Sequence, residues 1–272
     1  MTNYLVSNNT FMVDRIVFTR KFKDLTGYRL KLYLYMCRVV GFNPNGRYFK
    51  SYKEASKELN MTESKYKSAL KWLESNHFIK KENNKMGRAN IYRVMFLPLF
   101  DGQTYYSREH IVRDRQILKQ GGYGYVEMPI ELLQGAILSN HSDWTDLRIL
   151  TLGLLYLYFW IDVFGGIDPN ILHIKNTGKL HIDQSILIDL QTTENRFTNN
   201  IAFFEKQGLL TKVKCVYRQN QNAAEYELQY IGDVGKVASQ SGDIHYTLFR
   251  FTIIPSLKLQ NAQIRTNGGL DI

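Results

Sequence analysis

Two segments of the chain combine hydroxyl, amide and cationic side chains with apolar residues at helical spacing. One follows Thr62 and the other follows Thr193. Lysine side chains on an exposed helix face can neutralise phosphates, while Arg and Asn can pair with base edges in a DNA groove. The predicted outward positions are Ser64, Lys65, Lys67, Ser68 and Lys71 in the first segment, and Asn195, Arg196, Thr198, Asn199 and, at the margin, Asn200 in the second. The alternative interpretation of either set is a solvated helix face.

Further cations follow each helical segment, in what the alternation of residues predicts to be a β-hairpin. Such side chains could reach phosphates or a minor groove beside the preceding helix, or could simply keep the surface soluble. They are Lys80, Lys81, Lys85 and Arg88 after the first segment, and Lys212, Lys214 and Arg218 after the second.

The elements that must position the first set occur in the order of a winged helix-turn-helix. Ser51 and Glu54 have the spacing of a capping box, and Thr62 can cap the longer helix that carries the lysines. The predicted elements are a helix over 25–40, a turn over 41–46, an extended stretch over 47–50, helices over 51–59 and 62–75, and strands over 78–82 and 90–94 joined by a basic loop over 83–89.

The second half of the chain repeats this order. Residues 62–66 (TESKY) align without a gap on residues 193–197 (TENRF), an offset of 131, whereas residues 25–30 align on 144–149 at an offset of 119. The second copy therefore contains about 12 additional residues, within 165–179. Its wing is expected to consist of strands over 209–217 and 225–231 with a loop over 218–224.

These patterns predict an α+β protein with two tandem winged helix-turn-helix domains related by an internal repeat. The expected divisions are a basic domain over 1–100, a linker over 101–124, a second domain over 125–232, and a tail over 233–272. A strand predicted over 245–254 in the tail could extend a sheet or pair with another subunit, which would form a homodimer.

The positive charge is concentrated in the first domain. The chain has 35 Lys and Arg against 25 Asp and Glu; residues 1–100 contain 19 of the basic and 7 of the acidic residues, and the remainder contains 16 and 18. This asymmetry favours a polyanionic partner, with surface solubility as the alternative. We expect the first domain to contribute more electrostatic affinity and the second more of the sequence discrimination.

Motifs that would indicate an enzyme are missing from the sequence. It contains no P-loop, no H-E-x-x-H and no G-x-S-x-G, and its six histidines include no close pair in sequence. We therefore expect neither catalysis nor a cofactor or metal. Cys37 and Cys215 suit a reduced compartment, the N-terminus does not resemble a secretory signal, and the apolar run over 149–161 is shorter than the roughly 20 residues that a membrane span requires. The expected location is the cytoplasm, without membrane association.

Residues 25–94 resemble the winged-helix DNA-binding part of replication initiators from plasmids and phages of low-GC Gram-positive bacteria. The shared features are a short helix, a break, a lysine-rich helix, the entry Phe78-Ile79-Lys80-Lys81 into the wing, and a glycine-containing wing that ends in Ile91-Tyr92. The resemblance implies binding of double-stranded DNA at origin repeats, bending or opening of that DNA, and recruitment of host replication proteins. A transcriptional regulator, a conjugation or segregation accessory protein, and a winged-helix protein-interaction module are the alternatives.

Overall fold

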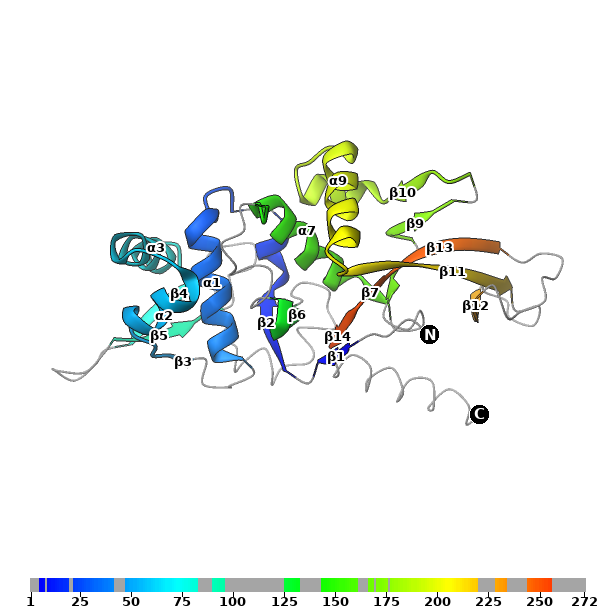
Figure 1. The fold of residues 1–272 in the computed structure, drawn as a ribbon. Coiled ribbons are helices and arrows are strands. Elements are labelled where there is room, and N and C mark those ends of the chain that lie inside the picture. Colours follow the sequence, from blue (N-terminus) through cyan, green and yellow to red (C-terminus); the bar gives the residue numbers. More distant parts are fainter. Residues whose placement is uncertain are drawn as a thin grey trace. The chain divides into compact units, whose positions relative to one another are not determined.

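The computed structural model describes residues 5–7, 9–19, 22–41, 47–82, 90–95, 125–132, 143–160, 166–168, 170–175, 177–219, 228–233 and 244–255. The chain divides into two compact units, and Figure 1 labels their helices and strands. The amino-terminal unit is Asn9–Leu157, and the carboxy-terminal unit combines Met1–Asn8 with Tyr158–Ile272. Both contain helices and strands, so the chain belongs to the α+β class.

The amino-terminal unit contains every helix and strand predicted over 25–94, in the predicted order. A three-stranded antiparallel sheet with the order β3-β5-β4 accompanies three helices. The elements are α1 (Gly27–Val40), β3 (Arg47–Tyr48), α2 (Tyr52–Leu59), α3 (Glu63–Ser75), β4 (Ile79–Glu82) and β5 (Ile91–Val94). The predicted turn over 41–46 and the loop over 83–89 lie, apart from Gly41, outside the described residues.

Local capping explains where α2 and α3 begin. The Ser51 hydroxyl accepts a hydrogen bond from the Glu54 backbone N–H, and the Ser51 backbone N–H donates to the Glu54 carboxylate, which is the predicted capping box. Asn60 adopts a left-handed conformation at the end of α2, and the Thr62 hydroxyl then accepts from the Lys65 N–H. These contacts separate the two helices by a short, defined turn.

The same unit contains a second group of elements that surrounds a nearly all-apolar helix. This group comprises β2 (Thr10–Asp14), the short helix η1 (Arg15–Thr19), β6 (Tyr125–Pro129), α6 (Ile130–Leu132) and α7 (Asp146–Leu157). Strands β2 and β6 pair antiparallel, and α7 contacts both η1 and β6. Because residues 149–156 of α7 are all buried, this helix needs neighbours on every side. The compact units therefore divide the chain differently from the predicted domains, since β6 and α7 belong to the amino-terminal unit.

The carboxy-terminal unit is built on a sheet whose main path has the order β10-β9-β13-β11-β12, with β8 pairing both β13 and β7. A separate parallel pair joins β1 to β14. The elements are β1 (Leu5–Ser7), β7 (Phe159–Trp160), β8 (Gly166–Ile167), β9 (Leu172–Ile174), β10 (Leu180–Ile182), α8 (Gln184–Asp189), α9 (Glu194–Lys206), β11 (Leu210–Gln219), β12 (Leu228–Asp233), β13 (Ile244–Phe251) and β14 (Ile253–Pro255).

Strand β13 lies within this sheet, between β9 and β11, although the sequence placed its residues in a tail outside the second domain. It pairs with β11 from Leu210↔Phe251 to Tyr217↔Ile244. The Thr252 N–H donates to the Leu209 carbonyl, as the Met95 N–H donates to the Phe78 carbonyl in the other unit. Strand β5 pairs with β4 in the amino-terminal unit. In the carboxy-terminal unit, the equivalent partner of β11 is β13 and not β12. Its buried Leu248, Phe249 and Phe251 explain this placement.

Equivalent backbone conformations recur at the offset of 131. Asn60 and Gln191 have φ values of 44° and 46°, and His77 and Gly208 have φ values of 62° and 67°. The Thr193 hydroxyl accepts from the Arg196 N–H, as Thr62 does from Lys65. The segments α2-turn-α3-β4 and α8-turn-α9-β11 therefore share the turn between the helices, the cap of the second helix and the turn into the strand. The starts of α2 and α8 differ, since Ser51 caps α2 and Asp183 caps α8.

Within the described segments, no helix is both long enough and apolar enough to cross a membrane.

Candidate nucleic-acid interface

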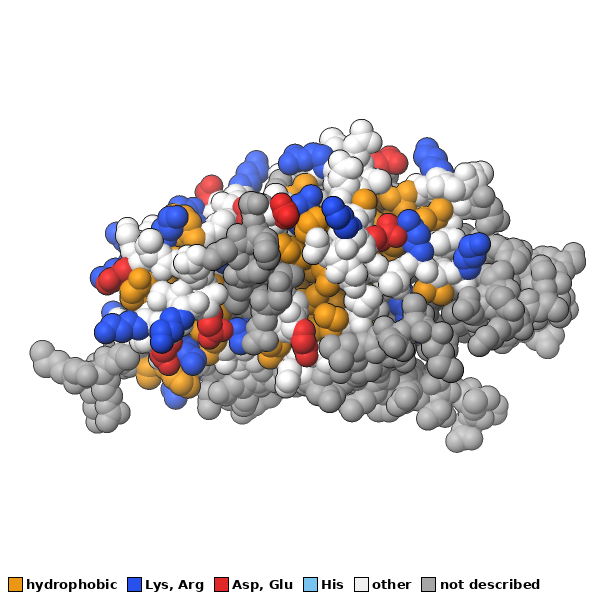
Figure 2. All heavy atoms as spheres, viewed as in Figure 1, with side chains coloured by type: hydrophobic (Ala, Val, Ile, Leu, Met, Phe, Trp, Pro, Cys, Tyr) orange, Lys and Arg blue, Asp and Glu red, His pale blue; other side chains and the backbone are white. Residues whose placement is uncertain are grey.

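Helix α3 presents the predicted set of polar side chains on one exposed face. Tyr66, Ala69 and Leu73 are buried on the opposite face, at three- and four-residue intervals. The exposed set consists of Ser64, Lys65, Lys67, Ser68 and Lys71. Lys and Arg side chains are visible on the surface around α3 in Figure 2. The face is therefore accessible to a ligand and positively charged.

The lysines of this face differ in their local partners. The Lys67 ammonium lies 2.6 Å from the Glu63 carboxylate one turn away, and its side chain is 71% exposed. The hydrogen bond to Glu63 raises the pKa of Lys67. Within the described residues, Lys65 and Lys71 form no ion pair. Lys65 and Lys71 are thus better placed than Lys67 to attract a phosphate without first breaking a contact.

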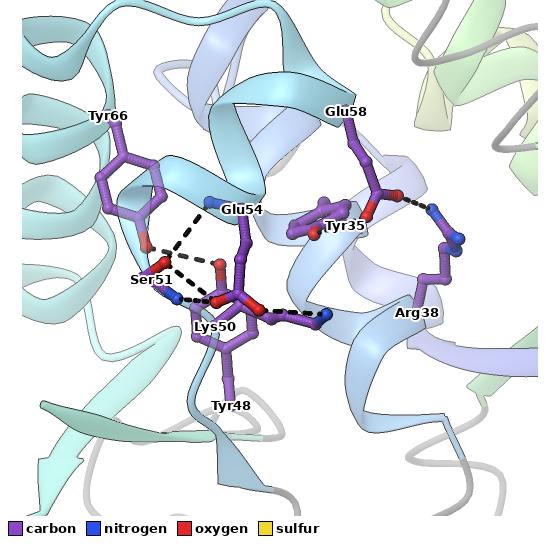
Figure 3. A network of polar contacts seen from close by, with 8 residues as sticks. All are labelled: Tyr35, Arg38, Tyr48, Lys50, Ser51, Glu54, Glu58 and Tyr66. Carbon is purple, nitrogen blue, oxygen red and sulfur yellow. Dashed lines mark hydrogen bonds and ion pairs between the residues drawn. The ribbon is translucent and has the colours of Figure 1, made fainter. Parts of the chain in front are cut away.

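A network of buried and half-buried polar groups holds α3 against the rest of the unit (Figure 3). The hydroxyls of Tyr48 on β3 and Tyr66 on α3 lie 3.4 Å apart. Burial raises the pKa of both tyrosines, so both hydroxyls remain protonated. The Glu58 carboxylate of α2 accepts hydrogen bonds from Tyr35 and Arg38 of α1, at 3.1 and 2.6 Å. These contacts join α1 to α2 and β3 to α3, and the second fixes the buried face of α3 against the sheet.

The first predicted wing is described only in its strands. Lys80 and Lys81 are exposed on β4, whereas Lys85 and Arg88 lie outside the described residues. Sequence reasoning overlooked two arginines of the same sheet, Arg47 and Arg93. Their neighbours across β3, β5 and β4 depend on strand register, which a local pattern does not reveal.

Three further lysines near α2, Lys50, Lys53 and Lys57, were also absent from the predicted set. Lys53 and Lys57 are exposed, and Lys50 lies 3.6 Å from Glu54. The spacing of Lys53 and Lys57 on the polar face of a short amphipathic helix was a usable signal, because helix α2 immediately precedes the turn into α3.

Helix α9 exposes four of its five predicted residues. Asn195, Arg196, Thr198 and Asn199 are accessible, and Phe197, Ile201 and Phe204 are buried. The prediction for Asn200 is wrong, because its side chain is only 5% exposed. Asn200 lies three residues after Phe197 and four before Phe204, so it belongs to the buried stripe.

The cations of β11 are in different environments. The Lys212 ammonium lies 2.9 Å from the Glu205 carboxylate of α9 and 5.8 Å from the centre of the Phe249 ring. Lys214 is exposed, and Arg218 stands opposite Gln229 of β12 in the backbone register. Lys214 is thus more accessible to an anionic ligand than Lys212, which is partly engaged within the unit.

Two histidines on consecutive strands meet in the carboxy-terminal unit. His173 of β9 and His181 of β10 are direct cross-strand partners, with ring centres 4.6 Å apart. In the described part of the chain, no three His, Cys, Asp or Glu side chains are grouped so that they could hold a metal ion.

Comparisons with known proteins add no relationship to this picture. No protein-family model matches the chain, and no curated protein has a significantly similar sequence.

Proposed function

We propose that this protein binds double-stranded DNA sequence-specifically through two winged-helix domains. The observation that carries the proposal is the exposed Ser and Lys face of α3. This helix begins at a capped turn after α2, and its buried face is attached to the sheet by the contact between Tyr66 and Tyr48. A helix-turn-helix inserts its second helix into the major groove, where cations on the exposed face meet phosphates.

The second proposed domain consists of α8, α9 and the strands around β11. It is supported by the backbone turns and caps that recur at the offset of 131, and by the exposed Asn195, Arg196 and Asn199. Asn can pair with adenine and Arg with guanine.

The two helices carry different chemistry. The α3 face has three lysines and no Asn, Gln or Arg among its predicted positions, whereas the α9 face has two Asn and one Arg. We therefore assign most of the electrostatic affinity to α3 and most of the base discrimination to α9.

The role that we propose is replication initiation on a plasmid or phage, in the cytoplasm, with binding to origin repeats and recruitment of host replication proteins. This narrower proposal rests on the resemblance of residues 25–94. A test of replication initiation requires knowing where the binding sites occur in a genome, whereas a test of DNA binding does not.

The decisive experiment is selection of bound fragments from random duplex DNA by the purified full chain at about 0.15 M salt. Two adjacent half-sites about one helical turn apart would support reading by both domains. Clustered copies of that motif beside the gene would support initiation, whereas single copies at promoters would favour a regulator. Salt-sensitive binding without a motif would overturn sequence specificity, and absence of binding would overturn the whole proposal.

A further inference from the structure

The face of the β3-β5-β4 sheet that points away from α3 carries a row of three cations. Arg47 pairs with Arg93, which in turn pairs with Lys80, so the three side chains lie side by side across the strands. Neighbouring Tyr48 points to the opposite face, where its hydroxyl meets Tyr66 of α3. Successive side chains of a strand alternate between faces, so the cationic row and α3 lie on opposite sides of the sheet.

Glu82 orients two of these cations. Its carboxylate lies 2.8 Å from Arg47 Nε and 2.9 Å from Arg93 Nη2, and it accepts a hydrogen bond from Arg93 Nε at 3.0 Å. Each guanidinium has five N–H donors, so both arginines retain donors for another anion. Three cations against one carboxylate leave the row positively charged. Like charges directly opposite each other destabilise a sheet, so packing alone does not explain this arrangement.

An exposed aromatic residue follows the strand that begins the row. Phe49 comes one residue after β3 and two residues beyond Arg47, the spacing that puts two side chains on the same side of an extended chain, and it is 61% exposed. Among the described residues, only Phe49 and Ile188 are large hydrophobic side chains with this degree of exposure. In Figure 2, hydrophobic side chains lie beside Lys and Arg side chains over the region of β3 and β5, at the lower left.

We propose that this sheet face, formed by Arg47, Phe49, Lys80 and Arg93, binds single-stranded nucleic acid. A base stacks on Phe49, and the phosphates on either side of it contact the guanidinium and ammonium groups. Single strands expose the faces of their bases, so an aromatic ring next to a cationic groove or row is the usual means of binding them. A duplex hides those faces, so this site is separate from the duplex interface on α3 and goes beyond the proposed function.

The test is binding of the full chain to fluorescein-labelled oligo(dT) of about 20 nucleotides, followed by fluorescence anisotropy. F49A should weaken binding about fivefold or more, which corresponds to the loss of one stacked base. F49W should restore it, because the indole ring also stacks. R47Q should lower the magnitude of the salt slope by about 0.7, the value for one phosphate contact on a single strand.

I188A is the matched control, since Ile188 is 72% exposed and lies in the other unit. It should bind oligo(dT) as the unmodified chain does. Equal binding by F49A and the unmodified chain would overturn the proposal, as would the absence of oligo(dT) binding. Duplex binding is measured in parallel and should be unchanged in F49A, so failure of the duplex proposal is recognised separately.

Discussion

The backbone N–H of Gly27 donates to both carboxylate oxygens of Asp146, at 2.9 and 3.0 Å. Gly27 is the first residue of α1 and Asp146 is the first residue of α7, so the two helices meet at their N-termini. The first turn of α1 contains no acidic residue, and Thr26 forms no side-chain capping bond. Asp146 thus supplies the negative charge that a helix N-terminus favours.

Removal of this contact should destabilise the amino-terminal unit. We expect D146A to lower the free energy of unfolding by about 1 kcal/mol, the usual effect of losing a helix cap. Chemical denaturation followed by circular dichroism measures the change. D143A is the control, because Asp143 is exposed and accepts hydrogen bonds from Thr145 and Arg148 through its backbone carbonyl. Equal stability of D146A and D143A would show that the carboxylate does not cap α1.

Gly153 should not tolerate a side chain. A Cβ at this position would overlap the ring of Phe18, because α7 passes close to η1 there. G153A is expected to cost about 1–3 kcal/mol of stability through overpacking. Thermal unfolding measures this, and the double variant F18L/G153A should recover part of the loss. If the second substitution made the protein still less stable, the contact would not be the cause.

The lysines of α3 should bind DNA through phosphates. K65Q/K71Q should weaken binding to all duplexes alike and reduce the magnitude of the salt slope by about 1.8, the value for two contacts. The measurement is duplex binding at several salt concentrations. K175Q/K179Q removes two exposed lysines of the β9–β10 turn, which lie outside the proposed interface, and serves as the control. An unchanged slope in K65Q/K71Q would remove α3 from the interface.

Arg196 should select bases. R196A is expected to relax the preference at one or two base pairs by about 1–3 kcal/mol. Repeating the selection from random duplexes with this variant reveals the change, and K206A, in the last turn of the same helix, is the matched control. An unchanged consensus with R196A would contradict the proposed division between α3 and α9.

Glu54 should make stability depend on pH in the acid range. Hydrogen bonds from the Ser51 backbone and hydroxyl lower the pKa of Glu54 from its ordinary value of 4.5. A lowered pKa in the folded state gives stability that is present above the ordinary pKa and is lost as the pH falls through the folded one. The unmodified chain should therefore be more stable than E54Q at neutral pH, and the difference should shrink below about pH 4.5.

The measurement is denaturant unfolding of both chains across this pH range. E74Q, in the last turn of α3, controls for the loss of one exposed carboxylate. A difference between E54Q and the unmodified chain that persisted in acid would indicate that the charge of Glu54 plays no part in the cap.

Features that depend on residues close in sequence could be predicted from the sequence. The capping box of Ser51 and Glu54, the start of α3 after Thr62 and the buried stripe of Tyr66, Ala69 and Leu73 all arise from contacts over three to seven residues. The error at Asn200 shows the limit of this reasoning, because the width of a buried stripe depends on the element packed against it.

Relationships between distant segments were decided only by the tertiary structure. The insertion of β13 between β9 and β11, the contact of Gly27 with Asp146 and the row of Arg47, Arg93 and Lys80 each join residues far apart in the chain. Strand order and register follow from burial of apolar faces across the whole sheet, which no short pattern encodes. The sequence by itself determined the helices and their exposed chemistry, and the packing of the sheets decided which cations became neighbours.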